Sequence, residues 1–384
     1  MLGMTSNAHA ADRRLRVLVN AVAVRTGGGG TFVISQLAAL AQRPDLDVTV
    51  FATGRVAQEL ERITGLTIRR PPRFGLPTRL LWEHVALARE SRRFDVLYCT
   101  GNFVLPLAHV PQVVTMQNAL HFGAAARRVR RSASLRRRIR LALEARLARA
   151  SVRKAFAVSA VSDTLRAAIA EDTGTQRHVR TVPSATPVLP PPAPVAEPQP
   201  YVISVAHDHP HKDWDRLVAV FANNPDLPPL LAVGAFGRTR REQLSNGAAT
   251  GRIRFRGVVD DRAELAGLYA GAACCVVHSR LESFGLTVLE ALAAGVPVVA
   301  SDIPAHREVC GRHAHLYDVG DMRDLADLLR ETISHLPSSR KPPLDSSWTW
   351  DHNAERLASM LRGAAWEADS ITARKRGKHD AAEY

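Results

Sequence analysis

Two glutamates separated by seven residues lie in the stretch of sequence with the clearest capacity for chemistry. Glu282 and Glu290 flank a Ser-Phe-Gly turn that opens an apolar helix. Gly285 lets the backbone pass close to a ligand, and the N–H groups of residues 285–287 would project from the helix N-terminus, an arrangement suited to phosphate. Glu282 precedes the turn and Glu290 lies about one helical turn inside, so they should reach different parts of one ligand. The alternative is two solvated carboxylates, which the following apolar run and Gly-Val-Pro turn disfavour for Glu290.

A second polar segment, His207–Asp213, follows an apolar run that we expect to be a strand. At the end of such a strand, Lys212 would place a positive charge on the same anion as the helix N-terminus. The alternating histidines His207, His209 and His211 lack a neighbouring carboxylate set, so they would make a poor closed metal site. The sequence therefore predicts no metal.

The elements that must position these residues predict two α/β domains. In the first half, strands are expected at 15–20, 48–51, 95–99, 112–115 and 155–158, with a glycine-rich loop at 25–31 and a helix at 32–42. Ser162 is the expected N-cap of a helix over 163–170. In the second half, strands are expected at 201–205, 230–233, 253–255, 273–277 and 297–301, alternating with helices from Trp214 and at 263–271, 287–294 and 322–336. Alternating strands and helices are typical of doubly wound parallel sheets.

Proline content sets the boundary between these two series. Residues 183–200 contain eight prolines, and we assign 1–188 to the first domain, 189–200 to a linker and 201–350 to the second domain. A further helix over 351–370 and a basic, mobile tail over 371–384 complete the chain. Ligands of such sheets bind at the carboxyl ends of the strands, so a deep cleft between the domains is the expected site.

Composition limits the class of protein. The 384 residues carry a formal net charge of +14, and 46% of them are hydrophobic. This hydrophobic content favours a folded globular chain over global disorder. The N-terminus lacks an apolar signal-peptide core, and no apolar run approaches the length needed to span a bilayer. Four cysteines at no metal or disulfide spacing indicate buried thiols in a reducing compartment, so a cytoplasmic location is expected.

Several motifs together resemble the donor domain of the retaining glycosyltransferases of family 4 (glycosyl transferases group 1), which have the GT-B fold. They are the Glu-x7-Glu spacing with its Phe-Gly-Leu, the segment Gly295–Asp302, the Glu308-Val309 pair, Tyr269-Ala270 and the His211-Lys212-Asp213 loop. The first half resembles the family more loosely, through 27–30, 113–118 and 158–162. The resemblance implies an α/β GT-B architecture: two Rossmann-like domains facing a deep cleft, with the C-terminal helix crossing back to the N-terminal, acceptor-binding domain.

The resemblance implies a role for each matched residue. Lys212, which should hold the diphosphate, and Glu282, which should contact the donor sugar, are the expected catalytic residues, and Glu290 should bind the ribose. Gly28 and Gly29 should let the N-terminal loop close over the donor. The complete expected donor set is Gly28, Gly29, His207, Lys212, Gly257, Val258, Glu282, Phe284, Gly285, Leu286, Thr287 and Glu290.

Two departures from the family pattern leave alternatives open. The arginine that often precedes the family's lysine is absent from 205–210, so His207, Arg280 or Arg238 could supply the second positive group. The N-terminal position that is commonly histidine corresponds to Gln117 or Asn118, with His121 close behind. These three residues are the candidates for the acceptor side.

The implied reaction moves a hexose from a nucleotide-diphosphate sugar to a hydroxyl of a glycan or lipid-linked acceptor, in cell-envelope or exopolysaccharide biosynthesis. Lys212 and the helix N-terminus would stabilise the anionic leaving group. Family members retain the anomeric configuration, so same-face attack needs no protein nucleophile. The nucleotide sugar is the donor substrate, no cofactor is expected, and the absence of an Asp-x-Asp motif argues against a metal.

Arginines crowd residues 127–154, with Leu135, Ile139, Leu143 and Leu147 at helical spacing among them. A basic amphipathic helix of this kind is typical of attachment to an anionic membrane surface, here the inner membrane face. The alternative is a charged helix that packs its leucines on its own domain. The arginines proposed for the membrane surface are Arg130, Arg131, Arg137 and Arg138.

Other classes of protein fit the sequence less well. A nucleic-acid-binding protein is suggested by charge alone, and neither interleaved aromatic residues nor a recognition module supports it. The glycine-rich loop at 25–31 is a weak match to a dinucleotide-binding oxidoreductase. A sugar-nucleotide epimerase or hydrolase of the same fold remains an alternative that product analysis would separate.

Overall fold

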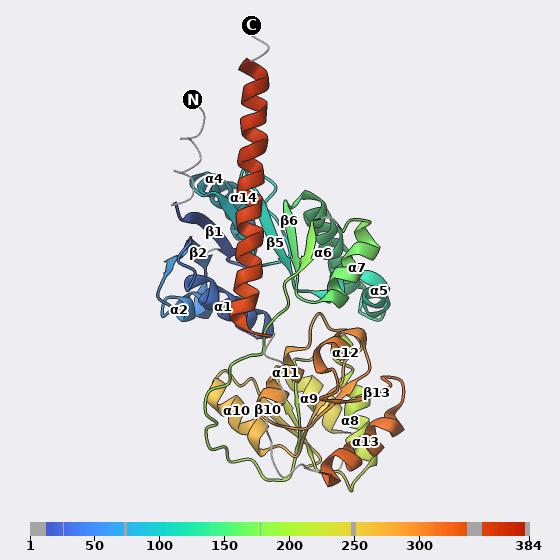
Figure 1. The fold of residues 1–384 in the computed structure, drawn as a ribbon. Coiled ribbons are helices and arrows are strands. Elements are labelled where there is room, and N and C mark those ends of the chain that lie inside the picture. The colour runs from blue at the N-terminus through green and yellow to red at the C-terminus, as the bar shows by residue number, and fades with distance from the viewer. Residues whose placement is uncertain are drawn as a thin grey trace.

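The computed structural model describes residues 13–25, 27–72, 75–176, 178–246, 251–335 and 348–380, and it divides into two α/β domains, one above the other in Figure 1. In the N-terminal domain, seven parallel strands lie in the order β3-β2-β1-β4-β5-β6-β7. Their bounds are β1 Leu15–Ala21, β2 Leu46–Ala52, β3 Leu66–Arg69, β4 Val96–Cys99, β5 Gln112–Met116, β6 Ala157–Ala160 and β7 Val179–Thr181. The helices are α1 Gly28–Ala41, α2 Gly54–Leu60, α3 Leu76–Trp82, α4 Ala88–Glu90, α5 Gly123–Arg131, α6 Leu135–Lys154 and α7 Asp163–Thr173.

The C-terminal domain has a second parallel sheet, in the order β10-β9-β8-β11-β12-β13. Its strands are β8 Val202–Val205, β9 Leu230–Val233, β10 Ile253–Gly257, β11 Cys274–Val277, β12 Val298–Ser301 and β13 His315–Tyr317. Its helices are α8 Trp214–Asn223, α9 Arg238–Ser245, α10 Arg262–Gly271, α11 Leu286–Ala293, α12 Pro304–Cys310 and α13 Met322–Ser334. In both sheets the strand order reverses beside the first strand, so loops at the carboxyl ends of the strands form a crevice there. The predicted α/β class with two doubly wound domains is confirmed.

The chain passes between the domains twice. The described residues between β7 and β8 form no helix or strand. After the C-terminal domain, α14 (Trp350–Asp380) returns along the N-terminal sheet, where it packs against α1 and strands β4 to β6. Leu357 and Leu361 are buried in this contact, and Gln36 Nε2 donates a hydrogen bond of 2.8 Å to Asn353 Oδ1.

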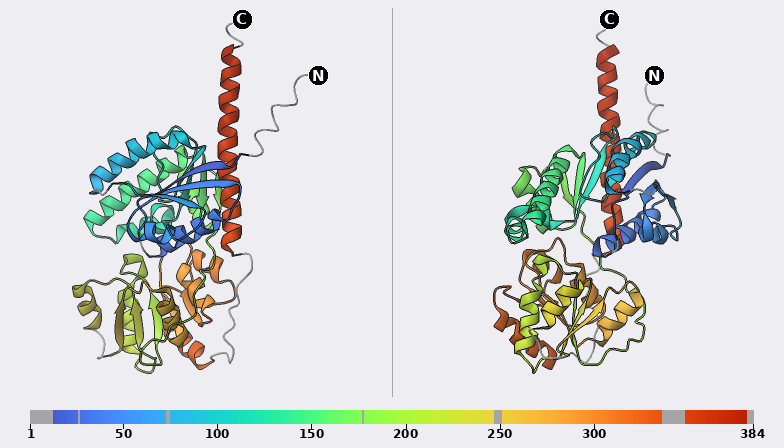
Figure 2. Two further views of the ribbon diagram at one scale, coloured as in Figure 1. Left: turned by 90° about the vertical axis from the view of Figure 1, so that its left-hand side faces the viewer. Right: turned by 180° about the vertical axis from the view of Figure 1, so that it is seen from behind.

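Helix α14 corrects the prediction for the end of the chain. The expected helix of 351–370 and the separate tail beyond it are one continuous helix to Asp380, which projects past the N-terminal domain (Figures 1 and 2). The end of the predicted tail, 381–384, lies outside the described residues. No proline occurs after residue 350 to stop the helix.

The basic stretch is two helices rather than one. Helix α5 ends at Arg131, and α6 begins at Leu135 after a turn that contains two serines. The prediction that Arg130 faces a membrane is wrong: Arg130 is buried and donates a hydrogen bond to the Leu120 carbonyl oxygen. In the side view, α6 lies on the face of the N-terminal sheet opposite α14 (Figure 2).

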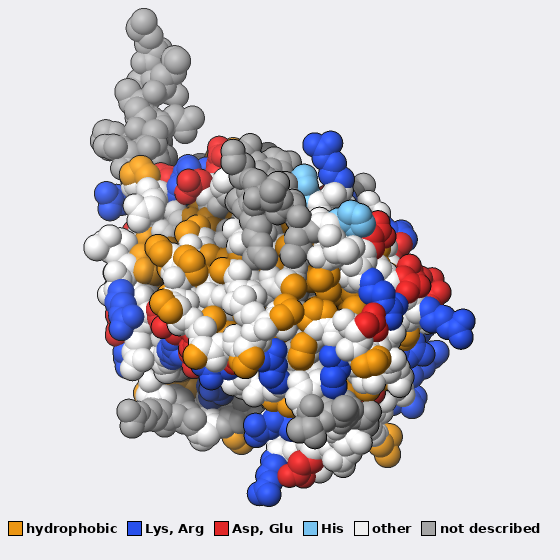
Figure 3. Space-filling view, turned by 90° about the horizontal axis from the view of Figure 1, so that it is seen from below, with side chains coloured by type: hydrophobic (Ala, Val, Ile, Leu, Met, Phe, Trp, Pro, Cys, Tyr) orange, Lys and Arg blue, Asp and Glu red, His pale blue; other side chains and the backbone are white. Residues whose placement is uncertain are grey.

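The surface away from the cleft is of mixed character. Seen from the end of the C-terminal domain, hydrophobic side chains gather in the middle, between charged side chains of both signs near the edge (Figure 3). Within the described ranges, no helix combines the length and the apolar character needed to cross a bilayer. All four cysteines are buried and unpaired.

Candidate active site

A cavity of about 1010 Å³ lies between the two domains. The N-terminal domain contributes the glycine-rich segment at the start of α1, parts of α1 and α2, and Gln117. The C-terminal domain contributes His207, Lys212, residues 258–260 and the segment from Glu282 to Thr287. The predicted donor residues therefore converge on one cavity, except Gly257, which does not line it.

The donor loop, residues 282–285, connects the region after β11 to α11. Gly285 has φ +110°, a left-handed conformation that favours glycine, and an added Cβ there would lie 3.3 Å from the His306 ring. No side chain caps α11 at this turn, so its first N–H groups are not satisfied by a side chain. Leu286 and Thr287 line the cavity beside it.

Lys212 and Glu282 form an ion pair within the cavity. Lys212 ends a 3₁₀ turn, and the left-handed Asp213 (φ 44°) that follows redirects the chain into α8. Burial alone would raise the pKa of Glu282, but Lys212 beside it, together with His211 and His306, outweighs that effect and lowers the pKa to about 2. Ser279 Oγ also donates a hydrogen bond of 2.8 Å to Glu282 Oε1. Glu282 is therefore charged at neutral pH, and a bound diphosphate would compete with it for the lysine.

Glu290 lies on α11 with its carboxylate held on two sides. Arg262 Nη1 lies 2.7 Å from Glu290 Oε1, and the buried Tyr269 hydroxyl lies 3.4 Å from Oε2. Burial, with Glu290 adding to it, raises the pKa of Tyr269 well above its usual value, so this hydroxyl is a donor to the carboxylate. Arg262 lines the cavity and was not predicted: it begins α10, 28 residues before its partner, and no local pattern marks the pairing.

The glycine-rich segment lies directly across the cleft from the donor loop. An added Cβ on Gly28 would lie 3.9 Å from Leu286, and one on Gly29 would lie 3.7 Å from Gln117 Oε1. Gly30 can only be glycine here, since its Cβ would meet the Arg25 carbonyl oxygen at 2.3 Å. At Gly28 the N-terminal domain thus approaches the Leu286 side chain of the C-terminal domain through a residue without a side chain.

Of the three candidates for the second positive group, only His207 lines the cavity. The backbone N–H of Ala235 donates to His207 Nδ1 at 3.0 Å, which leaves Nε2 as the protonated nitrogen, directed toward Gly27. Arg280 instead pairs with Asp213. Arg238 is on α9, paired with Glu242 and exposed.

The predicted acceptor residues do not all reach the cavity. Gln117 lines it, with its Nε2 donating to the Thr100 carbonyl oxygen at 2.8 Å. Asn118 caps the short turn that follows it. His121 is buried beside Asn118 and packs against Phe103, so the structure removes it from direct contact with an acceptor.

Arg137 occupies a different place from the one predicted. Its Nη2 lies 3.4 Å from His209 Nδ1, across the domain boundary at the rim of the cavity. Arg131 and Arg138 are exposed on α5 and α6. Among the residues for which the structure gives a placement, no cluster of three or more His, Cys, Asp or Glu residues is arranged to hold a metal ion.

His211, in the segment His207–Asp213, should make the stability of the fold depend on pH. Burial lowers the pKa of His211 to about 4. Between pH 6.5 and 4 the unfolded chain therefore binds the proton that the folded chain refuses, and stability falls as the pH falls through this window. When the pH is lowered from 7 to 4.5, the free energy of unfolding should fall by about 1–2 kcal/mol less in His211→Asn than in the wild type. Urea titrations at the two pH values measure this difference. The exposed His335→Asn should behave as wild type, and an unaltered pH dependence in His211→Asn would contradict the assignment.

Family comparisons agree with this geometry. Residues 199–335 match the model described as "Glycosyl transferases group 1", and residues 26–187 match "Glycosyltransferase Family 4". A phosphatidyl-myo-inositol mannosyltransferase of Mycobacterium leprae is 43% identical over 131 residues, 32% of this chain and 34% of that protein. An O-antigen chain mannosyltransferase B of Escherichia coli is 34% identical over 124 residues, 32% and 29% of the two chains. These alignments span about one third of each curated relative.

Solved structures show the same fold. The Anabaena protein HepE, crystallised with UDP-glucose, has a TM-score of 0.63 at 17% identity, with 94% of this chain and 100% of that chain covered. WaaG, described as a glycosyltransferase of lipopolysaccharide biosynthesis, has a TM-score of 0.60 at 16% identity over 93% of this chain and 99% of that chain. The fold and the cleft define a two-domain protein of the GT-B class. With both domains matched, the chain belongs to glycosyltransferase family 4.

Proposed function

We propose that this chain is a retaining glycosyltransferase that moves a hexose from a nucleotide-diphosphate sugar to a hydroxyl of a glycan or lipid-linked acceptor. The observation that carries the proposal is the convergence of Lys212, Glu282, Glu290 and the α11 N-terminus on one interdomain cavity. The two relatives described above are a phosphatidyl-myo-inositol mannosyltransferase and an O-antigen chain mannosyltransferase. A mannosyl nucleotide is therefore the first donor to test, and a cell-envelope or exopolysaccharide acceptor the first class of acceptor.

The charges of the cavity suit the departure of a nucleoside diphosphate. As the bond between the anomeric carbon and the diphosphate oxygen breaks, Lys212, His207 Nε2 and the α11 amides would stabilise the negative charge that develops. The acceptor hydroxyl would attack from the same face and pass its proton to the departing phosphate. Glu282, held by Lys212 and Ser279, would then orient the sugar rather than attack it. Metal independence stays a prediction.

A thermal-shift panel tests the donor site. We expect one of UDP-, GDP- or ADP-sugars to raise the melting temperature of the wild type, and the shift to disappear in Glu290→Ala. Stabilisation by NAD or DNA alone would overturn the proposal. Product analysis with and without acceptor separates a transferase from the epimerase or hydrolase alternative, because only a transferase requires the acceptor to consume donor.

We further propose that α6 attaches the enzyme to an anionic membrane surface on the cytoplasmic side. The stripe residues Leu135, Ile139, Leu143 and Leu147 are 72%, 62%, 56% and 50% exposed, so they do not pack on their own domain. Exposed arginines at 136, 138, 140 and 146 lie among them. Exposed apolar side chains between cationic ones suit an interface of acyl chains and anionic headgroups.

Vesicle sedimentation tests this attachment. Wild-type protein should bind phosphatidylglycerol vesicles, and the double variant Ile139→Glu/Leu143→Glu should bind at least about tenfold more weakly, since each lost side chain contributes on the order of 1 kcal/mol or more. Trp366→Glu, at an apolar position on α14 that is 72% exposed, is the control. Equal binding by the double variant and the wild type would refute the attachment through α6.

A further inference from the structure

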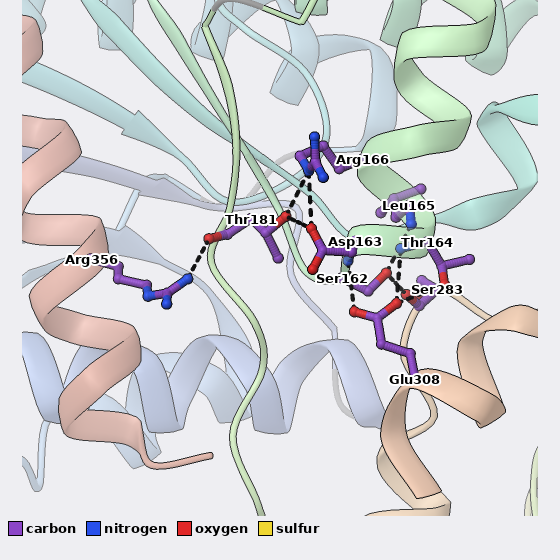
Figure 4. Close-up of polar contacts among 9 residues, drawn as sticks. All are labelled: Ser162, Asp163, Thr164, Leu165, Arg166, Thr181, Ser283, Glu308 and Arg356. Atoms are coloured by element: carbon purple, nitrogen blue, oxygen red, sulfur yellow. Dashed lines mark hydrogen bonds and ion pairs between the residues drawn. The ribbon is translucent and has the colours of Figure 1, made fainter. Parts of the chain in front are cut away.

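We infer that Ser162 and Glu308 are positioning residues for the reaction: they form an interdomain latch that fixes the donor loop when the domains close. The latch consists of the N-terminus of α7 in the N-terminal domain and Glu308 with Ser283 in the C-terminal domain (Figure 4). This inference rests on the proposed function, since it assigns a role in that reaction to residues that do not line the cavity.

Glu308 caps a helix that belongs to the other domain. Its Oε1 accepts a hydrogen bond of 2.7 Å from the backbone N–H of Asp163. Its Oε2 accepts from the backbone N–H and the hydroxyl of Thr164 at 2.8 and 2.6 Å. A carboxylate at a helix N-terminus is stabilised by the helix dipole as well as by these bonds. One side chain of α12 therefore satisfies three donors across the boundary.

Ser162 connects the same helix end to the donor loop. Its hydroxyl accepts from the backbone N–H of Leu165 at 2.9 Å and donates to the carbonyl oxygen of Ser283 at 2.6 Å. Ser162 is fully buried. Because Ser283 immediately follows Glu282, this bond fixes the peptide that carries the carboxylate paired with Lys212.

The donor loop is held on its other side as well. The Phe284 ring lies 5.1 Å from the ring of Trp348, in the segment that leads into α14. Further back, Asp163 Oδ1 accepts from the Thr181 hydroxyl, and the Thr181 carbonyl oxygen accepts from Arg356 of α14 at 3.3 Å. Residue 283 of the donor loop is therefore held by the N-terminal domain, and residue 284 by the segment that leads into α14.

Opening of the domains breaks the bonds from Glu308 to α7 and from Ser162 to Ser283 together. Glu282 then loses the fixed backbone beside it, whereas Lys212 and Glu290 stay in place because the C-terminal domain alone supports them. The latch thus makes the arrangement of the sugar site depend on closure, so that the donor binds in either state but reacts only in the closed one.

The distance between the domains tests the latch without substrate. Spin labels on the exposed positions Arg146→Cys and Arg323→Cys report closure, and the buried native cysteines should not react. We expect a narrow distance distribution in this parent and a longer, broader one after Glu308→Ala, whereas Glu331→Ala, an exposed glutamate on α13, should match the parent. An unchanged distribution in Glu308→Ala overturns the latch, whatever the outcome for the proposed activity.

Steady-state kinetics on the unlabelled chain tests positioning. In Ser162→Ala and Glu308→Ala, kcat should fall by roughly tenfold or more, with the donor Kd from calorimetry changed by less than about threefold. Asp321→Ala removes an equivalent N-cap from α13, so it controls for the loss of a helix cap. A kcat within about twofold of wild type, or a loss equal to that of Asp321→Ala, overturns the assignment.

Discussion

Lys212→Ala should lower kcat by about 100-fold or more while the protein stays folded. Lys212 is the one lysine that lines the cavity in the part of the chain that the structure describes, and its ammonium would face the diphosphate as negative charge develops on it. Loss of one preorganised electrostatic group of this kind costs about 2.7–4 kcal/mol in the barrier. Initial rates of nucleoside diphosphate release at saturating donor and acceptor measure the effect.

The fold should tolerate this change because Glu282 keeps the Ser279 hydroxyl as a partner. The pKa of Glu282 should rise from its lowered value, because burial then acts against less neighbouring positive charge. Lys154→Ala is the matched control, since Lys154 donates to the Pro106 carbonyl oxygen far from the cavity. A kcat for Lys212→Ala within about fivefold of wild type would remove Lys212 from the mechanism.

The central strands of both sheets could be predicted from sequence, whereas of the four edge strands β3, β7, β10 and β13 only β10 was predicted. Strands β1, β8 and β11 are buried on both faces, so they appear in the sequence as short apolar runs between turns. Strand β3 alternates half-buried and exposed residues, and β13 has three residues. Each of these strands pairs with a neighbouring strand on one side only. They are therefore less buried and lack a distinct apolar pattern.

Sequence alone can bring candidate site residues together where one local segment carries them. Glu282, Gly285 and Glu290 belong to one turn and one helix, so spacing alone places them together. Arg262 and Glu308 act on partners 28 and 145 residues away. Such pairs depend on how helices from distant parts of the chain meet, which hydrophobic periodicity does not specify.

For the basic stretch, residues 127–154, the prediction from the local pattern was too simple. Charge and leucine spacing over 127–154 predict one amphipathic surface, but Arg130 lies inside the domain and Arg137 faces His209 at the cleft. Helical spacing gives the direction of each side chain relative to its neighbours. It does not say which residues the adjoining domain covers.

Glu290→Ala should weaken donor binding by roughly 10-fold to 100-fold, as expected when a charged acceptor of sugar hydroxyl hydrogen bonds is removed. The carboxylate already holds Arg262 at 2.7 Å, so it is oriented before the ribose arrives and little ordering cost remains at binding. Calorimetric titration of the nucleotide sugar that the thermal-shift panel selects gives the change in Kd.

A conservative variant distinguishes ribose binding from a structural role for Glu290. Glu290→Gln keeps an oxygen acceptor and the shape of the side chain, so it should retain more affinity than alanine, while both variants lose the charged bond to Arg262. The Arg262 side chain is 32% exposed and can be solvated when its partner is removed. Equal, wild-type affinity in both variants would mean that Glu290 only anchors α10 to α11, and the ribose would then have to bind elsewhere in the cavity.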